Sequence, residues 1–116
     1  MLIVDDEPDI RQIAAIALER LGGFRVKTAA SGAEALRLAG VEVPDALLID
    51  VMMPDLDGPT TLQRLRALGV TAPAVFLTAR VQRQEVLRWQ ECGAAEVVGK
   101  PFDPLKLPDV IRRCLA

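Results

Sequence analysis

The sequence contains no histidine and no tyrosine, and it has only two cysteines and few other aromatic residues. Without histidine the chain has no Ser-His-Asp triad, no histidine-based zinc site and no phosphohistidine of its own. Any chemistry must therefore come from aspartate, glutamate, threonine, serine, lysine or cysteine.

Long hydrophobic runs and an excess of basic charge are also missing. Charged residues or prolines divide every apolar segment well short of the length that crosses a bilayer. The net charge of -2 gives no basic surface for a nucleic-acid backbone or an anionic membrane. Cys92 and Cys114 lack metal-ligand spacing, and no signal peptide is recognised, so we expect a soluble protein of the reducing cytoplasm with both thiols packed in helices.

What the sequence does have is an alternation of short apolar runs with longer segments of helical period. The 116 residues, 51% of them apolar, suffice for one compact domain over residues 1–116. Apolar runs predict strands at 1–4, 24–28, 46–49, 74–77 and 96–98. Helices are expected from Pro8 to Gly22-Gly23, from Ser31 to about Ala39, from Asp57-Gly58-Pro59 to Gly69, over about 82–92, and from Asp103-Pro104 onward, with Pro108 distorting its first turns. This pattern is typical of an α/β fold with a doubly wound, five-stranded parallel sheet and five helices.

Polar residues follow four of the expected strands. The first is followed by Asp5-Asp6-Glu7, the third ends in Asp50, the fourth in Thr78, and the fifth is followed by Lys100. Each residue alone has a structural explanation, such as a helix-start acid or a solvated cation. Because ligands of open parallel sheets bind outside the carboxyl ends of the strands, their convergence favours a site.

The three aspartates of this set would repel one another unless a cation lay between them. Hard oxygen ligands suit Mg²⁺. A divalent ion beside a carboxylate, with Lys100 and Thr78 on the next strands, fits a transferring phosphoryl group, which backbone N–H groups near Met52 and Ala79 would also bind. Asp50 is then the candidate nucleophile, forming an acyl phosphate.

Four segments in this order, LIVDDEP, LLIDVMMPDLDG, FLTA and GAAEVVGKPF, resemble the receiver domain of two-component response regulators, a chemotaxis-regulator-like phosphoacceptor domain. The resemblance covers essentially the whole chain. It implies a flavodoxin-like strand order 2-1-3-4-5, and a phosphoryl group transferred to Asp50 from a histidine kinase or histidine phosphotransfer protein. It further implies that the domain is no enzyme beyond catalysing its own phosphorylation and dephosphorylation.

The resemblance also assigns roles to single residues. Asp6, Asp50 and the backbone carbonyl of Met52 would bind Mg²⁺, or Mn²⁺ in its place, while Asp5 would hold the ion or assist through water. Thr78 would be the switch hydroxyl and Lys100 would contact a phosphoryl oxygen. The Lys100-Pro101 bond would be cis. Asp57-Gly58 is interpreted as a turn and helix start, with the glycine a backbone requirement.

The chain departs from the family at Val97, where the family usually carries tyrosine or phenylalanine three residues before the lysine. No ring can swing at this position, so we hypothesise that the signal travels through Thr78, the loop after it and the fourth helix. Trp89, the only tryptophan, is expected to be a packing residue rather than a partner-binding anchor. By resemblance, Met52 and Arg80 flank the phosphoryl site and tune hydrolysis.

Other classes fit less well. A phosphatase with an aspartate nucleophile needs a second aspartate two residues on, where this chain has Met52. A flavin module needs a hydroxyl- and glycine-rich phosphate loop after the first strand and aromatic residues to sandwich the ring. A scaffold without phosphotransfer has no reason to combine all five site residues.

Two alternatives remain for how the domain passes on its signal. The KPFDPLKLP segment resembles single-domain relatives, which favours a standalone phosphoryl shuttle or protein-binding regulator. The alternative is the N-terminal receiver of a longer regulator with a DNA-binding or enzymatic output domain. In either case the fourth helix, fifth strand and fifth helix form the family's usual face for a downstream target or a dimer.

Overall fold

The computed structural model describes all residues from Met1 to Ala116. Strands and helices alternate along the chain in the order β1 (Leu2–Val4), α1 (Pro8–Ile16) with a π-helical turn η1 (Ala17–Leu21), β2 (Lys27–Ala29), α2 (Gly32–Val41), β3 (Leu47–Asp50), α3 (Gly58–Ala67), β4 (Ala74–Thr78), α4 (Arg83–Glu91), β5 (Glu96–Gly99) and α5 (Leu107–Leu115). All strand pairs are parallel, in the order β2-β1-β3-β4-β5. The predicted fold class and strand order are confirmed.

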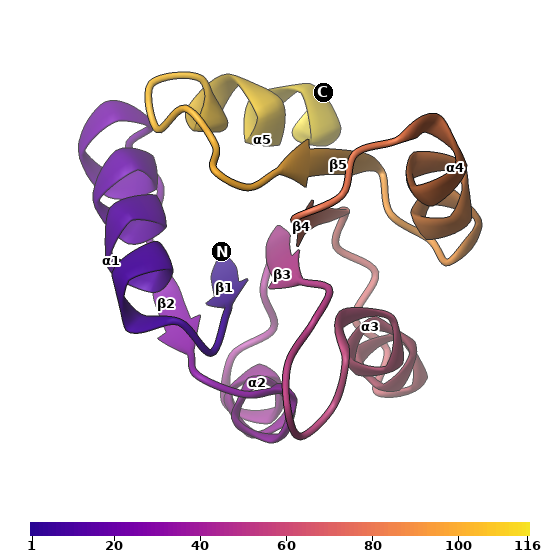
Figure 1. The fold of residues 1–116 in the computed structure, drawn as a ribbon. Helices are drawn as coiled ribbons and strands as arrows, with labels where there is room; N and C mark the ends of the chain where they lie inside the picture. The colour runs from indigo at the N-terminus through magenta and orange to yellow at the C-terminus, as the bar shows by residue number, and fades with distance from the viewer.

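Helices cover both faces of the sheet, with α1 and α5 on one side and α2, α3 and α4 on the other (Figure 1). Side chains alternate along each strand, so Ile49 and Phe76 pack towards α2, α3 and α4, whereas Leu48 and Leu77 pack towards α1 and α5. Because both faces are covered, the central strands are apolar throughout, and a polar residue marks where a strand leaves the core.

Strand β2 is shorter than predicted and begins at Lys27 instead of Phe24. The amide of Phe24 donates to the carbonyl of Leu18, 3.0 Å away, so the chain folds back onto the end of the first helix. The ring of Phe24 packs with the α1 and α5 cluster, under the guanidinium of Arg112. An apolar residue at position 24 therefore serves the helix layer, not the sheet.

Helix α5 begins at Leu107, not at Asp103-Pro104 as predicted. Asp103 instead closes a separate turn, in which its Oδ1 accepts the amide of Leu105 at 2.9 Å. The physical reason is Pro108, which has no N–H to continue a helix begun at Pro104 but is tolerated in a first turn. Pro108 therefore lies in the first turn of α5 and does not distort it.

The predicted starts of α2 and α3 are confirmed by their caps. Ser31 Oγ accepts the amide of Glu34 at 3.1 Å, and Asp57 Oδ1 accepts the amide of Thr60 at 2.7 Å. The expectation of two packed thiols is half right, because Cys114 is half-buried in α5 but Cys92 is exposed at the end of α4. None of the helices combines the length and apolar character that crossing a membrane requires.

Candidate functional site

The four polar strand ends meet at one edge of the sheet, as the sequence predicts. The strand register brings this about, because it pairs Val4 with Ile49, Asp50 with Leu77, and Thr78 with Gly99. Asp5 and Lys100 each directly follow a residue of these pairs. The sheet thus delivers one group from each of β1, β3, β4 and β5 to the same crevice.

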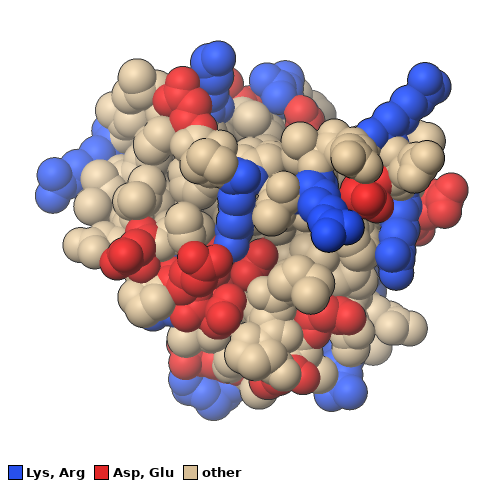
Figure 2. All heavy atoms as spheres, viewed as in Figure 1, with Lys and Arg blue, Asp and Glu red and all other residues tan.

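Three carboxylates lie together in this crevice. One oxygen from each of Asp5, Asp6 and Asp50 falls within 4.8 Å of the others. Asp5 is fully buried and Asp50 is 4% exposed, whereas Asp6 is more open to solvent. Acidic side chains gather in Figure 2 over the region where β1 ends. Such a concentration of negative charge is unfavourable unless cations balance it.

Lys100 supplies one positive charge to the cluster. Its Nζ lies 2.9 Å from Asp5 Oδ2, 3.2 Å from Asp50 Oδ1 and 3.2 Å from Glu7 Oε1. Burial opposes the charge of the ammonium, but the contacts with Asp5 and Asp50 outweigh it and raise the pKa of Lys100 above its ordinary value. The backbone amide of Lys100 donates to the carbonyl of Thr78 at 2.8 Å, and the bond to Pro101 is cis, as predicted.

Asp50 is only partly compensated by this lysine. Burial, followed by the repulsion of Asp5, raises the pKa of Asp50 to about 6, against the attraction of Lys100 and the amide of Met52. That amide lies 3.4 Å from Asp50 Oδ1, a long hydrogen bond. The ionised carboxylate of Asp50 therefore lowers the stability of the folded protein. Binding of a further cation, or neutralisation of the carboxylate, would remove this cost.

This cost predicts the behaviour of Asp50→Asn. The folded pKa of about 6 exceeds the ordinary value of 3.8, so folding takes up a proton between these values and wild-type stability falls as pH rises through them. In the presence of a metal chelator, the free energy of unfolding of the variant should exceed that of wild type by about 1–2 kcal/mol at about pH 7.5. The difference should shrink at about pH 4.5. Urea denaturation at both pH values measures it. A wild type that is the more stable at the higher pH would contradict the assignment.

The cluster also fits a hard divalent cation. Asp5 Oδ2 is buried and has no hydrogen bond of acceptable geometry, although Lys100 forms an ion pair with it. Its other oxygen, Oδ1, accepts the amide of Glu7 at 2.9 Å. A carboxylate oxygen without an aligned donor, beside two further aspartates, is the kind of ligand that Mg²⁺ prefers.

Thr78 lies at the end of β4 and is buried. Its Oγ1 accepts the amide of Arg80 at 3.2 Å, so the hydroxyl proton remains available as a donor. Sequence reasoning gave no role at the site to two supporting residues. Glu7 contacts Lys100, which its place in the acidic run could have suggested, and Arg11 Nη1 donates to the carbonyl of Asp5 at 2.8 Å, which no local signal indicated.

The sequence profile of the response regulator receiver domain matches residues 1–112. The chain belongs to the response regulator receiver family. Among curated relatives, response regulator Rre1 of Synechocystis sp. is 38% identical over all of this chain, which spans 51% of that protein. The transcriptional regulatory protein PrrA of Mycobacterium tuberculosis is 41% identical over 88% of this chain and 43% of its own length.

Solved structures agree with this assignment. The chemotaxis protein CheY4 of Vibrio cholerae superposes on this receiver domain with a TM-score of 0.91, at 32% identity, covering 98% of this chain and 96% of that one. A response regulator from Chloroflexus aurantiacus gives a TM-score of 0.88 at 37% identity, covering 98% and 94%. The receiver domain thus spans about half the length of the curated relatives above but nearly all of these two solved chains.

The structure shows the surroundings of Val97, the position at which this receiver domain departs from the family. Val97 is paired in register with Phe76. It packs against the core cluster that contains Phe76, on the side of the sheet covered by α2, α3 and α4. Trp89 of α4 meets Phe76 edge-on, with ring centroids 6.1 Å apart, as expected of a packing residue. The aromatic contact beneath α4 is therefore made by helix and strand β4, not by position 97.

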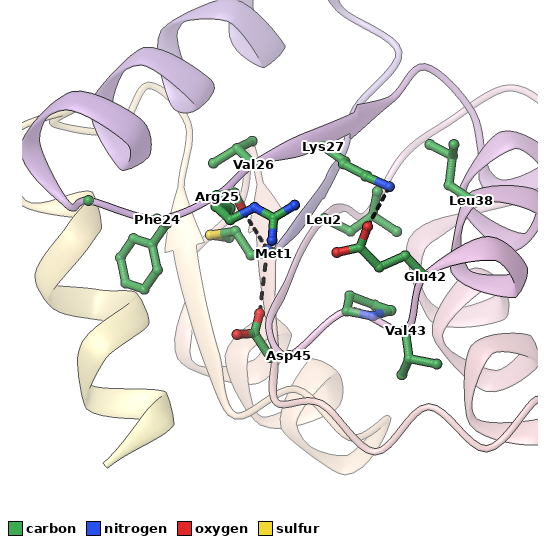
Figure 3. Close-up of a pocket in the computed structure, with 12 residues that line it drawn as sticks. Met1, Leu2, Phe24, Arg25, Val26, Lys27, Leu38, Glu42, Val43 and Asp45 are labelled. Atoms are coloured by element: carbon green, nitrogen blue, oxygen red, sulfur yellow. Dashed lines mark hydrogen bonds and ion pairs between the residues drawn. The ribbon is translucent and has the colours of Figure 1, made fainter.

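A separate cavity of about 440 Å³ lies at the opposite edge of the receiver domain's sheet, around the start of β1 (Figure 3). Most of its charged groups are paired, because Lys27 lies 2.7 Å from Glu42 and the amino group of Met1 contacts the carbonyl of Arg25 and the carboxylate of Asp45. The guanidinium of Arg25 lines the cavity without an ion pair, but the cavity has no cluster of carboxylates, so the aspartate crevice remains the candidate site.

Proposed function

We propose that Asp50 is the phosphoacceptor of this receiver domain and takes its phosphoryl group from the phosphohistidine of a histidine kinase or phosphotransfer protein. The observation that carries the proposal is Asp50 itself, a nearly buried carboxylate 3.2 Å from Lys100 within a cluster of aspartates. Receiver domains of response regulators interact with such kinases and phosphotransfer proteins.

In the transfer, an Asp50 oxygen attacks phosphorus, the bond from phosphorus to the imidazole nitrogen breaks, and the electron pair of that bond leaves with the imidazole. Lys100 balances charge on the phosphoryl oxygens, and the Thr78 hydroxyl with the amides of Met52 and Ala79 donates hydrogen bonds. Asp6, Asp50 and the Met52 carbonyl, with Asp5 directly or through water, would hold Mg²⁺ or Mn²⁺, which supplies further charge neutralisation when bound.

The proposed activity ends at the domain's own acyl phosphate. Two residues after the nucleophile lies Met52, whose exposed side chain offers no acid to protonate an ester's leaving group. A phosphatase acting on general phosphate esters is therefore the less favoured reading. Steady release of inorganic phosphate from a model ester would support that alternative.

The output of the phosphorylated state is a protein contact in this proposal. Thr78 leads into the loop before α4, and α4, β5 and α5 form the face that would meet a downstream target, an output domain or a second copy. The net charge of -2 gives no direct role to nucleic acid. Standalone action and action as the N-terminal receiver of a longer regulator both fit the relatives, and the length of the coding sequence distinguishes them.

Intact mass spectrometry tests the acceptor. Protein treated with a small-molecule phosphodonor and Mg²⁺ should gain one phosphoryl group, because Asp50 is the proposed acceptor and lies beside Lys100. Asp50→Asn and chelation should both abolish the gain. Asp45→Asn, which changes an aspartate outside the crevice, should leave it unchanged. Modification that persists in Asp50→Asn would overturn the assignment.

A further inference from the structure

The loop between β3 and α3, residues 51–57, directly follows Asp50 and has no regular secondary structure. Its far end is fixed locally, because the amide of Gly58 donates to the carbonyl of Val51 at 2.8 Å and Asp57 caps α3. Met52, close to Asp50, belongs to this loop. The middle of the loop is held by a different contact, which Asp55 makes with another helix.

Asp55 makes that connection, to a helix more than twenty residues earlier in the chain. Its Oδ1 accepts the amide of Gly32 at 3.3 Å and its Oδ2 accepts the amide of Ala33 at 3.0 Å, at the N-terminus of α2. The bond from Ala33, more than any other contact, lowers the pKa of Asp55, although the residue is exposed. The carboxylate is therefore ionised at neutral pH, and both bonds are charge-assisted.

Close packing reinforces the same junction. A Cβ added to Gly32 would lie 2.8 Å from Leu56 Cβ and would clash with Thr61 Oγ1, so the start of α2 fits directly against the loop and α3. Met53, two residues before Asp55, is buried in the core. The amide of Val51 joins the start of the loop to the carbonyl of Leu77 at 2.9 Å, and after Val51 the long-range hydrogen bonds of the loop are those of Asp55.

We propose that Asp55 is a positioning residue for phosphoryl transfer, which ties the loop to the N-terminus of α2 and so holds the backbone of Met52 beside Asp50. The inference rests on the proposed function. Asp55 touches none of the reacting groups and acts through the loop alone. The Met52 amide is already 3.4 Å from Asp50 Oδ1, and a looser loop would misalign it further, together with the carbonyl proposed as a metal ligand.

The test compares Asp55→Ala with Ser31→Ala. Both remove an acceptor from the N-terminus of α2, but Ser31 binds only its own helix, through Glu34. Asp55→Ala should lower the phosphorylation rate and the calorimetric Mg²⁺ affinity by about tenfold each, as for other supports of metal ligands. Ser31→Ala should leave both within about twofold, although it removes the N-cap of α2. Asp55→Asn, which retains one acceptor oxygen, should recover most of the rate.

A measurement on the metal-free protein separates this inference from the proposed function. Amide hydrogen exchange at Met52 and Met53 should accelerate in Asp55→Ala and stay at the wild-type rate in Ser31→Ala. If the wild type takes up no phosphoryl group, the proposed function fails while the exchange data still decide the role of Asp55. If the wild type is phosphorylated and the two alanine variants agree in rate, affinity and exchange, Asp55 is not a positioning residue.

Discussion

Phosphorylation of Asp50 in Lys100→Met should be at least about 100-fold slower than in wild type, because a preorganised charge facing the reacting group contributes on this scale. Lys100 is the only cation with ion pairs to Asp5 and Asp50 in the crevice. Methionine keeps much of the length and the apolar stem of lysine but no charge. Phosphoryl uptake followed by intact mass over time, in saturating phosphodonor and Mg²⁺, measures the loss.

Stability provides a second readout for the same variant. Without Lys100, the carboxylates of Asp5 and Asp50 remain buried with no counter-charge, which costs about 3 kcal/mol for a broken buried pair. Mg²⁺ should restore part of this loss, because it binds only the folded crevice. Lys106→Met, which removes an exposed lysine beyond β5, is the matched control and should change neither quantity. A Lys100→Met rate within about twofold of wild type would remove Lys100 from the mechanism.

The second large effect is expected at Gly58, on the strength of space rather than charge. A Cβ at this position would lie 2.5 Å from the carbonyl oxygen of Asp50 and 2.9 Å from Cα of Val51. Both are backbone atoms, so neither can rotate away as a side chain would. Gly58→Ala should therefore lose about 3 kcal/mol of unfolding free energy, or about 10 °C in melting temperature, and should displace Asp50 enough to slow its phosphorylation.

Gly40 in α2 is the matched control for this substitution. A Cβ there would have no neighbour within 4 Å. Gly40→Ala should raise the unfolding free energy by about 0.5–1 kcal/mol, since alanine is the better helix former. Thermal melts of the two variants beside wild type measure the contrast. Equal effects at Gly58 and Gly40 would show that the backbone of Asp50 does not constrain position 58.

The central strands and the site residues were predictable because burial on both faces leaves a simple signal. In β3 and β4 the apolar run ends at Asp50 and Thr78, so the sequence marks the edge of the sheet directly. The peripheral elements lack such a signal. Phe24 is apolar whether it joins β2 or packs on α1, and only the return of the chain to Leu18 decides between the two. The prediction started α5 at Asp103-Pro104, because either Pro104 or Pro108 is compatible with a first helical turn, whereas the helix begins at Leu107.

The residues that support the candidate site were less predictable than the groups proposed to react. Asp50 and Lys100 are recognisable in the sequence because each is a charged residue at the end of an apolar strand. The hydrogen bonds between Asp55 and α2, by contrast, join residues 22 and 23 positions apart. No local rule of sequence encodes such a contact. The same is true of the pKa of Asp50, about 6, which depends on how deeply the crevice buries it and on the distance to Asp5.

Trp89, which contacts Phe76 edge-on, also determines the intrinsic fluorescence of the protein. With one tryptophan and no tyrosine, essentially all near-ultraviolet emission of the chain originates at Trp89. The fluorophore lies on α4, under the guanidinium of Arg88 and against the strand that ends at Thr78. Light emitted by the unlabelled protein therefore reports on the packing of a single helix against β4, the junction through which the phosphorylated state is proposed to be read.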